Sequence, residues 1–390
     1  MVRRIDVTDA TIGTWGAITA LMREQMQNGS FEDTVITLEW SEENPSLGIG
    51  TNEDADQVDI EEVRDRGLRC GRIYHSNGGG SGIFTPELPL VLVYYEHDSY
   101  DKEGNSLLKH FDELNGAANA AALQQVGLDG EYRSIGDGEV VLDGDRYKVV
   151  ASAATSFPQS EYFAAVSSII WDAPPYGELM DEVIDMPDAK FEDKDTDSLT
   201  SRMRPVSMLL DELEKEVTKD EIVDAFVEQN VEKIFGSDEE IVPTQWGDDE
   251  VSFIEDMTPY FESDTWINRI STEDLCRGAP EHLDIGIAAY KSRKLIKASV
   301  LLDDGEVYDV QYSGDFYFRP AHRATTTWLL DMMAAAVTGL NATDEDALQS
   351  AIEPFFERDD VEYPALEPSD FVKPITRAAK NTEPITEYCD

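Results

Sequence analysis

Two short stretches of the sequence combine residue types that could hold and polarise an anionic substrate. The first is Gly78-Gly79-Gly80-Ser81-Gly82. Consecutive glycines let the backbone adopt positive φ and approach a ligand closely, and their successive N–H groups can form an anion-binding nest. The run fits neither a GxxxxGK[ST] phosphate loop nor a GxGxxG fingerprint in a βαβ unit, so an ordinary loop is the alternative interpretation.

Lys148 is the second feature, because it lies in a β-rich run, 147–151, behind the hairpin signal Asp143-Gly144. Turned inward, this lysine would be a point charge suited to a carboxylate or an α-phosphate. Turned outward, it would be an ordinary strand lysine in solvent.

A third basic group lies in a loop of an otherwise acidic chain, and it comprises Lys190, Lys194 and Arg202. It fits either a substrate loop or a solvated loop with local ion pairs. The five histidines show no metal-ligand spacing, so we expect no metal site. No GxSxG elbow is present. The scattered cysteines Cys70, Cys276 and Cys389 contain no CxxC pair, and we expect no disulfide framework.

The composition is strongly acidic: 31 Lys+Arg against 81 Asp+Glu give a formal net charge of −50 over 390 residues. Such a surface repels nucleic acid and anionic lipid, so we expect neither as a partner. The acidic residues are spread along the chain, and their repulsion becomes tolerable at molar salt, where the Debye length falls to ~3 Å. We therefore predict a cytoplasmic, monomeric protein of a salt-accumulating halophile.

The N-terminus lacks the apolar core of a signal peptide, and no apolar run approaches the ~18 residues of a membrane span. We expect no membrane association. At roughly 100–200 residues per domain, the length indicates two domains, which we place at 1–240 and 250–390, on either side of an acidic stretch with Pro243 and Gly247. The polar segment 373–390 is expected to be loosely ordered.

Hydrophobic periodicity predicts a mixture of helices and strands without regular βαβ alternation, which favours an α+β fold. The helices are expected near 15–26, 61–67, 107–125, 208–213, 222–235, 325–337 and 344–356. The strands are expected near 35–40, 88–95, 139–142, 147–151, 167–171, 283–290, 295–302 and 306–312.

Taken in order, these features resemble the lipoate–protein ligases of the biotin/lipoate ligase and transferase superfamily. The stretch Ser46-Leu-Gly-Ile-Gly-Thr-Asn-Glu53 resembles the family's S-V-x-x-G-x-N-Q, and residues 143–153 resemble its D-G-x-K-[VI]-x-G-S-A hairpin. Residues 190–202 resemble its K-x-x-x-K…S-x-x-S-R loop, and residues 263–268 and 314–317 resemble its C-terminal accessory domain. The resemblance implies a mixed, largely antiparallel central sheet flanked by helices, followed by a smaller α+β accessory domain.

The resemblance also implies an activity. Such a ligase activates lipoate with Mg-ATP to lipoyl-AMP and transfers the acyl group to a lysine of lipoyl carrier domains in 2-oxoacid dehydrogenase or glycine cleavage complexes. Lys148 is the implied catalytic residue, and with Gly80 it would contact lipoate. The implied ATP contacts are His75, Gly78, Gly79, Gly80, Ser81, Gly82, Ile83 and Lys148. Further loop contacts are expected from Arg72, Lys190, Lys194 and Arg202, and an apolar slot for the acyl chain from Ile83, Leu92 and Ile169.

Alternatives remain open. The residues that match the arginine pair of the family's R-R-x-S-G-G-G are Tyr74 and His75, which favours a non-catalytic or altered-substrate homologue that binds acyl groups or carrier domains. An octanoyl transferase would need a cysteine thiolate, and no cysteine here matches a nucleophile position. A biotin ligase is the remaining alternative.

Overall fold

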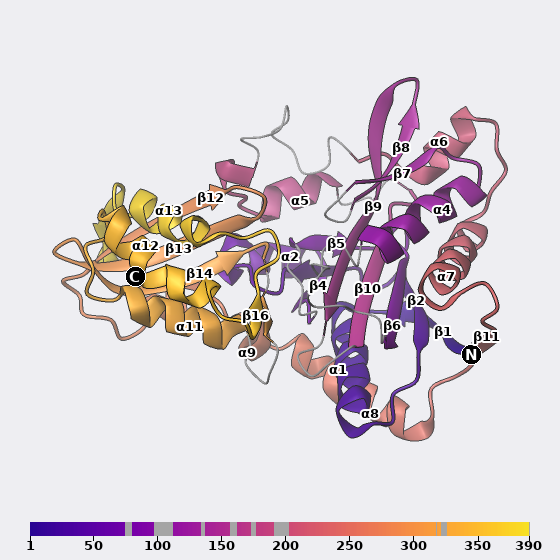
Figure 1. Cartoon of the computed structure of the whole chain (residues 1–390), viewed down its shortest axis with the longest axis horizontal. Helices are drawn as coiled ribbons and strands as arrows, with labels where there is room; N and C mark the ends of the chain where they lie inside the picture. Colours follow the sequence, from indigo (N-terminus) through magenta and orange to yellow (C-terminus); the bar gives the residue numbers. More distant parts are fainter. Residues whose placement is uncertain are drawn as a thin grey trace.

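An eight-stranded sheet forms the centre of the N-terminal part of the fold (Figure 1). The computed structural model describes residues 1–74, 80–96, 112–133, 137–156, 162–172, 177–190, 203–316, 318–320 and 326–389. The strands lie in the order β11 (Ile241–Pro243), β1 (Val2–Ala10), β2 (Thr34–Trp40), β6 (Leu90–Glu96), β10 (Tyr162–Ile169), β9 (Asp145–Ser156), β8 (Asp137–Leu142) and β7 (Gly130–Arg133). Strand β1 pairs in parallel with β11 and β2, and the other pairings are antiparallel. The predicted α+β class and mixed, largely antiparallel sheet are confirmed.

Helices cover both faces of this sheet. The alternation of side chains along β6 shows the two cores: Leu92 and Tyr94 pack with helix α1, whereas Val91 and Val93 pack under the helices of the opposite face. One face is covered by α1 (Ile12–Asn28) and α8 (Asp248–Phe261). The other is covered by α4 (Ala117–Gln125), α6 (Val206–Glu212) and α7 (Lys219–Phe235), and the π-helical turn η2 (Asp112–Gly116) precedes α4.

The predicted linker region contributes to the N-terminal part of the fold. Strand β11 pairs with β1, and helix α8 packs closely against α1. The approach requires a glycine on α1, because a Cβ built on Gly16 would lie 2.6 Å from the ring atom Cγ of Phe261. The division into domains 1–240 and 250–390 stays a prediction. Strand β11, between these two ranges, pairs on the large sheet, and α8, at the start of the second range, packs on α1.

A three-stranded sheet lies beside the large one, with β3 (Ser46–Ile49) between β4 (Arg69–Arg72) and β5 (Gly82–Phe84). Strand β3 is parallel to β4 and antiparallel to β5. Helices α2 (Ile60–Asp65) and α5 (Gly177–Val183) close a small core with it, which includes Leu47 and Ile83. This sheet positions the residues on both sides of the glycine stretch.

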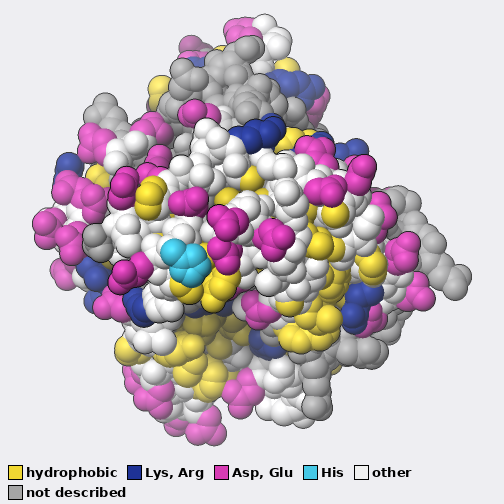
Figure 2. Space-filling model, turned by 90° about the vertical axis from the view of Figure 1, so that its left-hand side faces the viewer, with side chains coloured by type: hydrophobic (Ala, Val, Ile, Leu, Met, Phe, Trp, Pro, Cys, Tyr) yellow, Lys and Arg dark blue, Asp and Glu magenta, His cyan; other side chains and the backbone are white. Residues whose placement is uncertain are grey.

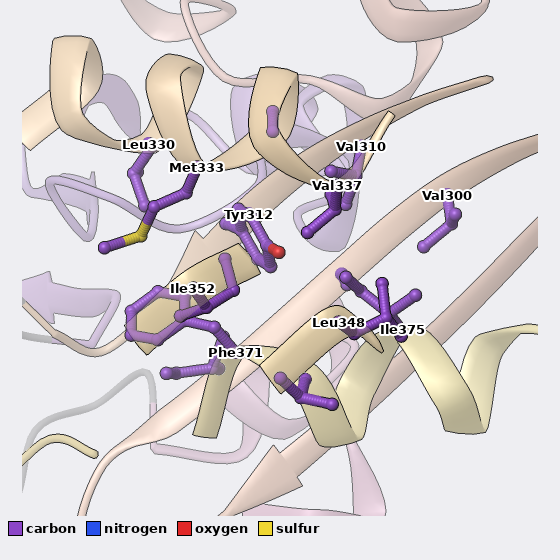
Figure 3. Packing of buried hydrophobic residues seen from close by; sticks show 14 of the residues in the cluster. Val300, Val310, Tyr312, Leu330, Met333, Val337, Leu348, Ile352, Phe371 and Ile375 are labelled. Atoms are coloured by element: carbon purple, nitrogen blue, oxygen red, sulfur yellow. The ribbon is translucent and has the colours of Figure 1, made fainter. Parts of the chain in front are cut away.

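The C-terminal part has its own sheet and core (Figures 1 and 3). The antiparallel sheet has the order β14 (Glu306–Gly314), β13 (Leu295–Asp303), β12 (Asp284–Lys291) and β17 (Thr382–Pro384). Helices α11 (Thr326–Val337), α12 (Glu345–Phe356) and α13 (Pro368–Ala378) pack on it. The shorter elements after α8 are α9 (Asp264–Ile267), α10 (Thr272–Cys276), β15 (Arg319–Pro320), β16 (Val361–Glu362) and α14 (Ile385–Tyr388). The 3₁₀ turns η1 (Ala55–Gln57) and η3 (Asp188–Lys190) belong to the N-terminal part.

Two expectations for the C-terminal part are wrong. The described part of this segment, 373–389, is ordered, because the end of α13 buries Ile375 in the core shown in Figure 3 and β17 pairs with β12. A disulfide joins Cys276 to Cys389, although none was expected; their Cα atoms lie 6.3 Å apart across 113 residues of sequence. Strand β17 returns the chain end to β12 and thereby brings the two cysteines together, a contact that their spacing does not encode.

Most predicted elements are present, with shifts at their ends. Strand β10 begins several residues before the predicted 167–171, and the first part of the predicted helix 107–125 lies outside the described residues. Strand β1 and helix α8 were not predicted. The four apolar residues that predicted the first helix, Trp15, Ile18, Met22 and Met26, are all buried.

The two parts of the chain meet at the loop Gly50–Asp56, which we call the junction loop. Asp54 at its centre is fully buried and forms an ion pair with Lys297 of β13, with Oδ2 2.9 Å from Nζ. Asp54 also accepts hydrogen bonds from the hydroxyl and the backbone N–H of Thr272, at the start of α10. Asn52 extends the contact: its carbonyl accepts the N–H of Gly314, and its amide donates to the carbonyl of Phe316 at 2.7 Å.

Breaking this ion pair should destabilise the protein strongly. Burial raises the pKa of Asp54, but the charge of Lys297 and the hydrogen bonds outweigh it, so the pKa is lowered below its usual value. Asp54 therefore contributes stability above about pH 4, which is lost as the pH falls through its folded-state pKa. We expect Asp54→Asn to cost ~3–5 kcal/mol in the free energy of unfolding, because it leaves Lys297 buried without a counter-charge.

Chemical denaturation at neutral pH measures this cost, with Lys297→Met and the double variant Asp54→Asn/Lys297→Met completing a cycle. The double variant should lose less than the sum of the two single losses. Strictly additive losses would contradict a direct interaction between the two charges.

Candidate functional site

The junction loop holds the C-terminal end of the glycine stretch. The carboxylate of Glu53 accepts hydrogen bonds from both the backbone N–H (2.7 Å) and the hydroxyl (2.5 Å) of Ser81. The N–H of Gly50 in turn donates to the Ser81 hydroxyl oxygen at 3.1 Å. Glu53 is itself buried, with 3% of its surface exposed, so its two bonds to Ser81 are shielded from water. Sequence reasoning gave Glu53 no role, since the contact depends on how β3 and β5 pair.

The predicted nucleotide contacts divide into three groups. Gly80, Ser81 and Gly82 are half-buried, which leaves their backbone accessible in part. Ile83 is 2% exposed, with its side chain in the core between β5 and α5, so this side chain is not available to a ligand. His75, Gly78 and Gly79 lie outside the described residues.

Arg72 was expected to contact the substrate, and the structure gives it a different role. Its guanidinium is fully buried and donates to backbone carbonyls on both sides of the junction. On one side it binds Gly50 (3.0 Å) and Glu53, and on the other Ile267 (2.8 Å) and Ile270 (3.1 Å). Burial lowers the pKa of Arg72 to about 9. We interpret Arg72 as a clamp that fixes the segment 267–270 against the junction loop.

Lys148 is half-buried near the start of β9. Two residues further on, Val150 pairs with Ile169, whose N–H donates to the carbonyl of Pro89. Pro89 directly precedes β6, in the connection that leads from β5 and the glycine stretch. Lys148 thus lies toward the end of the large sheet where this connection enters β6. The structure brings this lysine to the same end of the sheet as the chain that follows Gly82.

The structure also places the end of the predicted basic loop beside Lys148. Met203 forms an isolated parallel β-bridge with Lys148 through the backbone, and the N–H of Arg204 donates to the Lys148 carbonyl at 3.1 Å. Lys194 and Arg202 lie outside the described residues, and of Lys190 only the backbone, in η3, is described. Since Met203 directly follows Arg202, the loop returns to the candidate catalytic strand.

The three residues suggested for an apolar acyl slot do not come together. Ile83 belongs to the small core of the three-stranded sheet, Leu92 to the core under α1, and Ile169 to the core under α4 and α7. Each is almost completely enclosed by its own cluster. The slot assignment is therefore wrong, because strand neighbours that face opposite sides of a sheet cannot line one cavity.

None of the three cysteines provides a thiolate nucleophile. Cys70 is buried on β4, and burial raises the pKa of its thiol to about 12. Cys276 and Cys389 are joined to each other. A cysteine-dependent acyl transfer therefore has no candidate nucleophile in this fold.

Neither a metal-binding cluster nor a membrane-spanning helix is found in the part of the chain that the structure describes. Within it, no group of three or more His, Cys, Asp or Glu side chains could hold a metal ion. No helix within the same ranges has the length and apolarity to cross a bilayer.

Comparison with solved structures relates this geometry to known proteins. The chain is similar to lipoate-bound LipL1 of P. falciparum, with a TM-score of 0.63 and 11% identity over 96% of this chain and 98% of that one. It is also similar to the bipartite lipoate–protein ligase of Thermoplasma acidophilum, from a lipoylation system that includes its E2 lipoyl domain (TM-score 0.52, 17% identity, 68% of this chain and 96% of that one). A lipoate–protein ligase A bound with ATP gives a TM-score of 0.50 at 15% identity, over 69% of this chain and 100% of that one.

No family model and no curated protein matches the sequence. At these identities the structural similarity shows the fold alone. The chain has the fold of these lipoate–protein ligases, and the match to LipL1 spans both of its parts.

Replacing Glu53 with Gln should loosen the end of the glycine stretch. A neutral amide oxygen accepts hydrogen bonds less strongly than a carboxylate, so the Ser81 N–H should exchange with deuterium roughly tenfold faster. Hydrogen exchange of peptides that cover residues 80–84 measures this. Glu61→Gln, at an exposed position of α2, is the matched control, and equal exchange in both variants would remove Glu53 from this role.

Proposed function

We propose that this chain is a lipoate–protein ligase that activates lipoate with Mg-ATP and transfers the lipoyl group to a lysine of lipoyl carrier domains. The observation that carries the proposal is the similarity to lipoate-bound LipL1 over nearly the full length of both chains. The similarity to an ATP-bound ligase of the same fold supports ATP as co-substrate. The position of Lys148 near one end of the large sheet supports a reaction at that end.

The first proposed step forms the mixed anhydride. A carboxylate oxygen of lipoate attacks the α-phosphorus of ATP, the bond from this phosphorus to the bridging oxygen breaks, and pyrophosphate leaves. Two anionic groups must approach each other, so a cation between them lowers the barrier. We assign this role to the ammonium group of Lys148, with the backbone N–H groups of Gly80–Gly82 directed toward the nucleotide.

The second proposed step is transfer to the carrier. The neutral amine of a carrier lysine attacks the carbonyl carbon of lipoyl-AMP, the acyl–phosphate bond breaks, and AMP leaves while the amine loses a proton. The adenylate is already activated, so binding and orientation suffice and no enzyme nucleophile is needed. This chemistry is compatible with three cysteines that are buried or paired.

We propose lipoyl domains of 2-oxoacid dehydrogenase or glycine cleavage complexes as the carriers. The T. acidophilum ligase, a protein of the same fold, belongs to a lipoylation system that includes its E2 lipoyl domain, and this supports a carrier of that class.

The acidic surface supports a cytoplasmic, monomeric protein that works in concentrated salt. On the face shown in Figure 2, Asp and Glu side chains are spread across the surface rather than gathered at one place. A net charge of −50 distributed in this way is repulsive in dilute buffer and screened at molar salt.

Lipoate-dependent exchange of pyrophosphate into ATP, in molar KCl, tests the proposal. The wild-type protein should catalyse exchange only when lipoate is present, and Lys148→Ala should lose it by roughly 10²-fold or more, as when a group that stabilises transition-state charge is removed. Lys219→Ala, on the outer helix α7, is the matched control and should retain exchange.

Well-folded protein that exchanges with none of lipoate, octanoate and biotin would overturn the ligase proposal. Exchange with biotin alone would replace lipoate by biotin as substrate. Carrier binding without exchange would favour the non-catalytic homologue.

The thermal midpoint of unfolding should rise on transfer from dilute buffer to molar KCl. Each ~1 kcal/mol of relieved repulsion raises the midpoint by roughly 2–4 °C for domains of 150–250 residues, and several such increments are expected. Circular dichroism measures the shift, with an isosmotic uncharged solute as control. Equal midpoints in dilute buffer and molar KCl would contradict adaptation to salt.

A further inference from the structure

Two arginines lie beside the residue that leads into the glycine stretch. Arg23, on α1, donates through Nη1 to the hydroxyl oxygen of Tyr74 at 2.6 Å. Arg269, which follows α9, stacks over the ring of Trp266 with its Cζ 4.3 Å from the ring centroid. The Trp266 ring in turn lies edge-on to the ring of Tyr74, with 5.4 Å between the centroids. Arg23 thus contacts Tyr74 directly, and Arg269 is linked to it through the Trp266 ring. Tyr74 is the last described residue before 75–79.

The junction loop connects these arginines to the other end of the glycine stretch. Nη2 of Arg269 donates to the carbonyl of Thr51 at 2.6 Å, and the Thr51 hydroxyl donates to the carbonyl of Ile73 at 3.0 Å. The neighbouring residue of the loop, Gly50, binds Ser81. The junction-loop residues Gly50 and Thr51 therefore hold both ends of the glycine stretch, Gly50 through Ser81 and Thr51 through Ile73, the residue before Tyr74. Arg269, from the C-terminal part, binds the same loop at Thr51.

Arg23 and Arg269 differ in their ion pairs from other arginines of the same region. Arg64 and Arg69 form ion pairs with Asp264 (2.6 Å) and Glu262 (2.8 Å). Among the residues that the structure describes, no carboxylate lies within ion-pair distance of Arg23 or Arg269. The sequence 75–79 contains no acidic residue, and the nearby carboxylate of Glu53 is buried and bound to Ser81.

Both guanidinium groups retain donors for a ligand. A guanidinium has five N–H groups in a planar fork that matches phosphate oxygens. Within the described ranges, each of these arginines uses one nitrogen for a hydrogen bond. Arg23 is half-buried. Arg269 has an exposed surface, but its guanidinium lies against the Trp266 ring and the junction loop, and burial lowers its pKa to about 10. The backbone on either side of Arg269 is fixed by the Arg72 clamp, through the carbonyls of Ile267 and Ile270. The fork of Arg269 is therefore held in place before any ligand arrives.

We propose that Arg23 and Arg269 form a binding site for the terminal phosphates of a nucleoside triphosphate, at the Tyr74 end of the glycine stretch. The choice of a nucleotide as ligand rests on the proposed function. The two arginines come from α1 and from the segment after α9, and no sequence motif had indicated either residue. Charge-assisted, bidentate contacts are the strongest that a protein makes to phosphate.

Equilibrium binding to the full-length protein in molar KCl tests this site, with ATP, inorganic tripolyphosphate and AMP as ligands. Arg269→Gln and Arg23→Gln should each raise the Kd of ATP and tripolyphosphate by roughly tenfold or more, because each removes a charge-assisted contact. The Kd of AMP should change by less than about threefold, since AMP lacks the terminal phosphates. Glutamine can still donate to Thr51 or Tyr74, so the local packing is retained.

Two further variants make the result specific. Arg277→Gln, directly after α10, removes an exposed arginine that pairs with Asp274 and should bind all three ligands like wild type. Arg269→Lys keeps the charge without the planar fork and should fall between wild type and Arg269→Gln. The salt dependence of ATP binding should become less steep in the glutamine variants.

Equal weakening of ATP and AMP would place the arginines at the base or ribose and overturn the phosphate site. Unchanged ATP and tripolyphosphate binding in both glutamine variants would overturn it as well, and so would wild-type protein that binds neither ligand. The ligase proposal fails separately: the expected losses without lipoate-dependent exchange would retain the phosphate site and remove the ligase. Exchange in wild type, with normal ATP binding by both variants, would remove only the arginine site.

Discussion

The arrangement of the two parts of this chain depends on three buried charges at the junction, those of Arg72, Asp54 and Lys297. A charge in the protein interior is costly unless it is paired or fully hydrogen-bonded. Asp54 forms an ion pair with Lys297 across the junction, and Arg72 donates hydrogen bonds to backbone carbonyls on both sides of it. Because neither part can satisfy these groups alone, the hydrogen-bond geometry fixes how the parts meet. The same junction loop binds Ser81, so this constraint also positions the glycine stretch.

The acidic composition gives local cations a particular importance. A protein with a net charge of −50 presents a repulsive long-range field to a nucleotide and to an acyl carboxylate. Molar salt shortens that field to ~3 Å but leaves direct contacts largely intact. Binding of an anion must therefore come from groups in contact with it, and the groups that we propose are Lys148, backbone N–H groups and the guanidinium groups of Arg23 and Arg269. On the proposal that the protein works in concentrated salt, we expect high salt to favour both folding and substrate approach.

Sequence reasoning could predict the parts of this fold that carry their own periodicity. Helix α1 and strand β13 have apolar faces that match their buried residues. Strand β1 was missed because its buried positions do not alternate regularly, and α13 was missed because Pro374 and its polar residues mask a buried face. The site shows the same limit. Motif order selected Lys148 and the glycine stretch, but the Glu53–Ser81 contact and the clamp of Arg72 depend on strand pairing and on contacts between residues about 200 positions apart.

The C-terminal part is therefore a structural component of the candidate site and not an appendage. The segment that carries Arg269 is held by Arg72 on one side and by Asp54, through Thr272, on the other. A ligand that binds Arg269 must favour the state in which this segment is docked, since only that state places its guanidinium beside Tyr74. Thermodynamic reciprocity then requires that docking favours the ligand to the same degree. We therefore expect the integrity of the junction, including the buried ion pair of Asp54 and Lys297, to be coupled to occupancy of the proposed phosphate site.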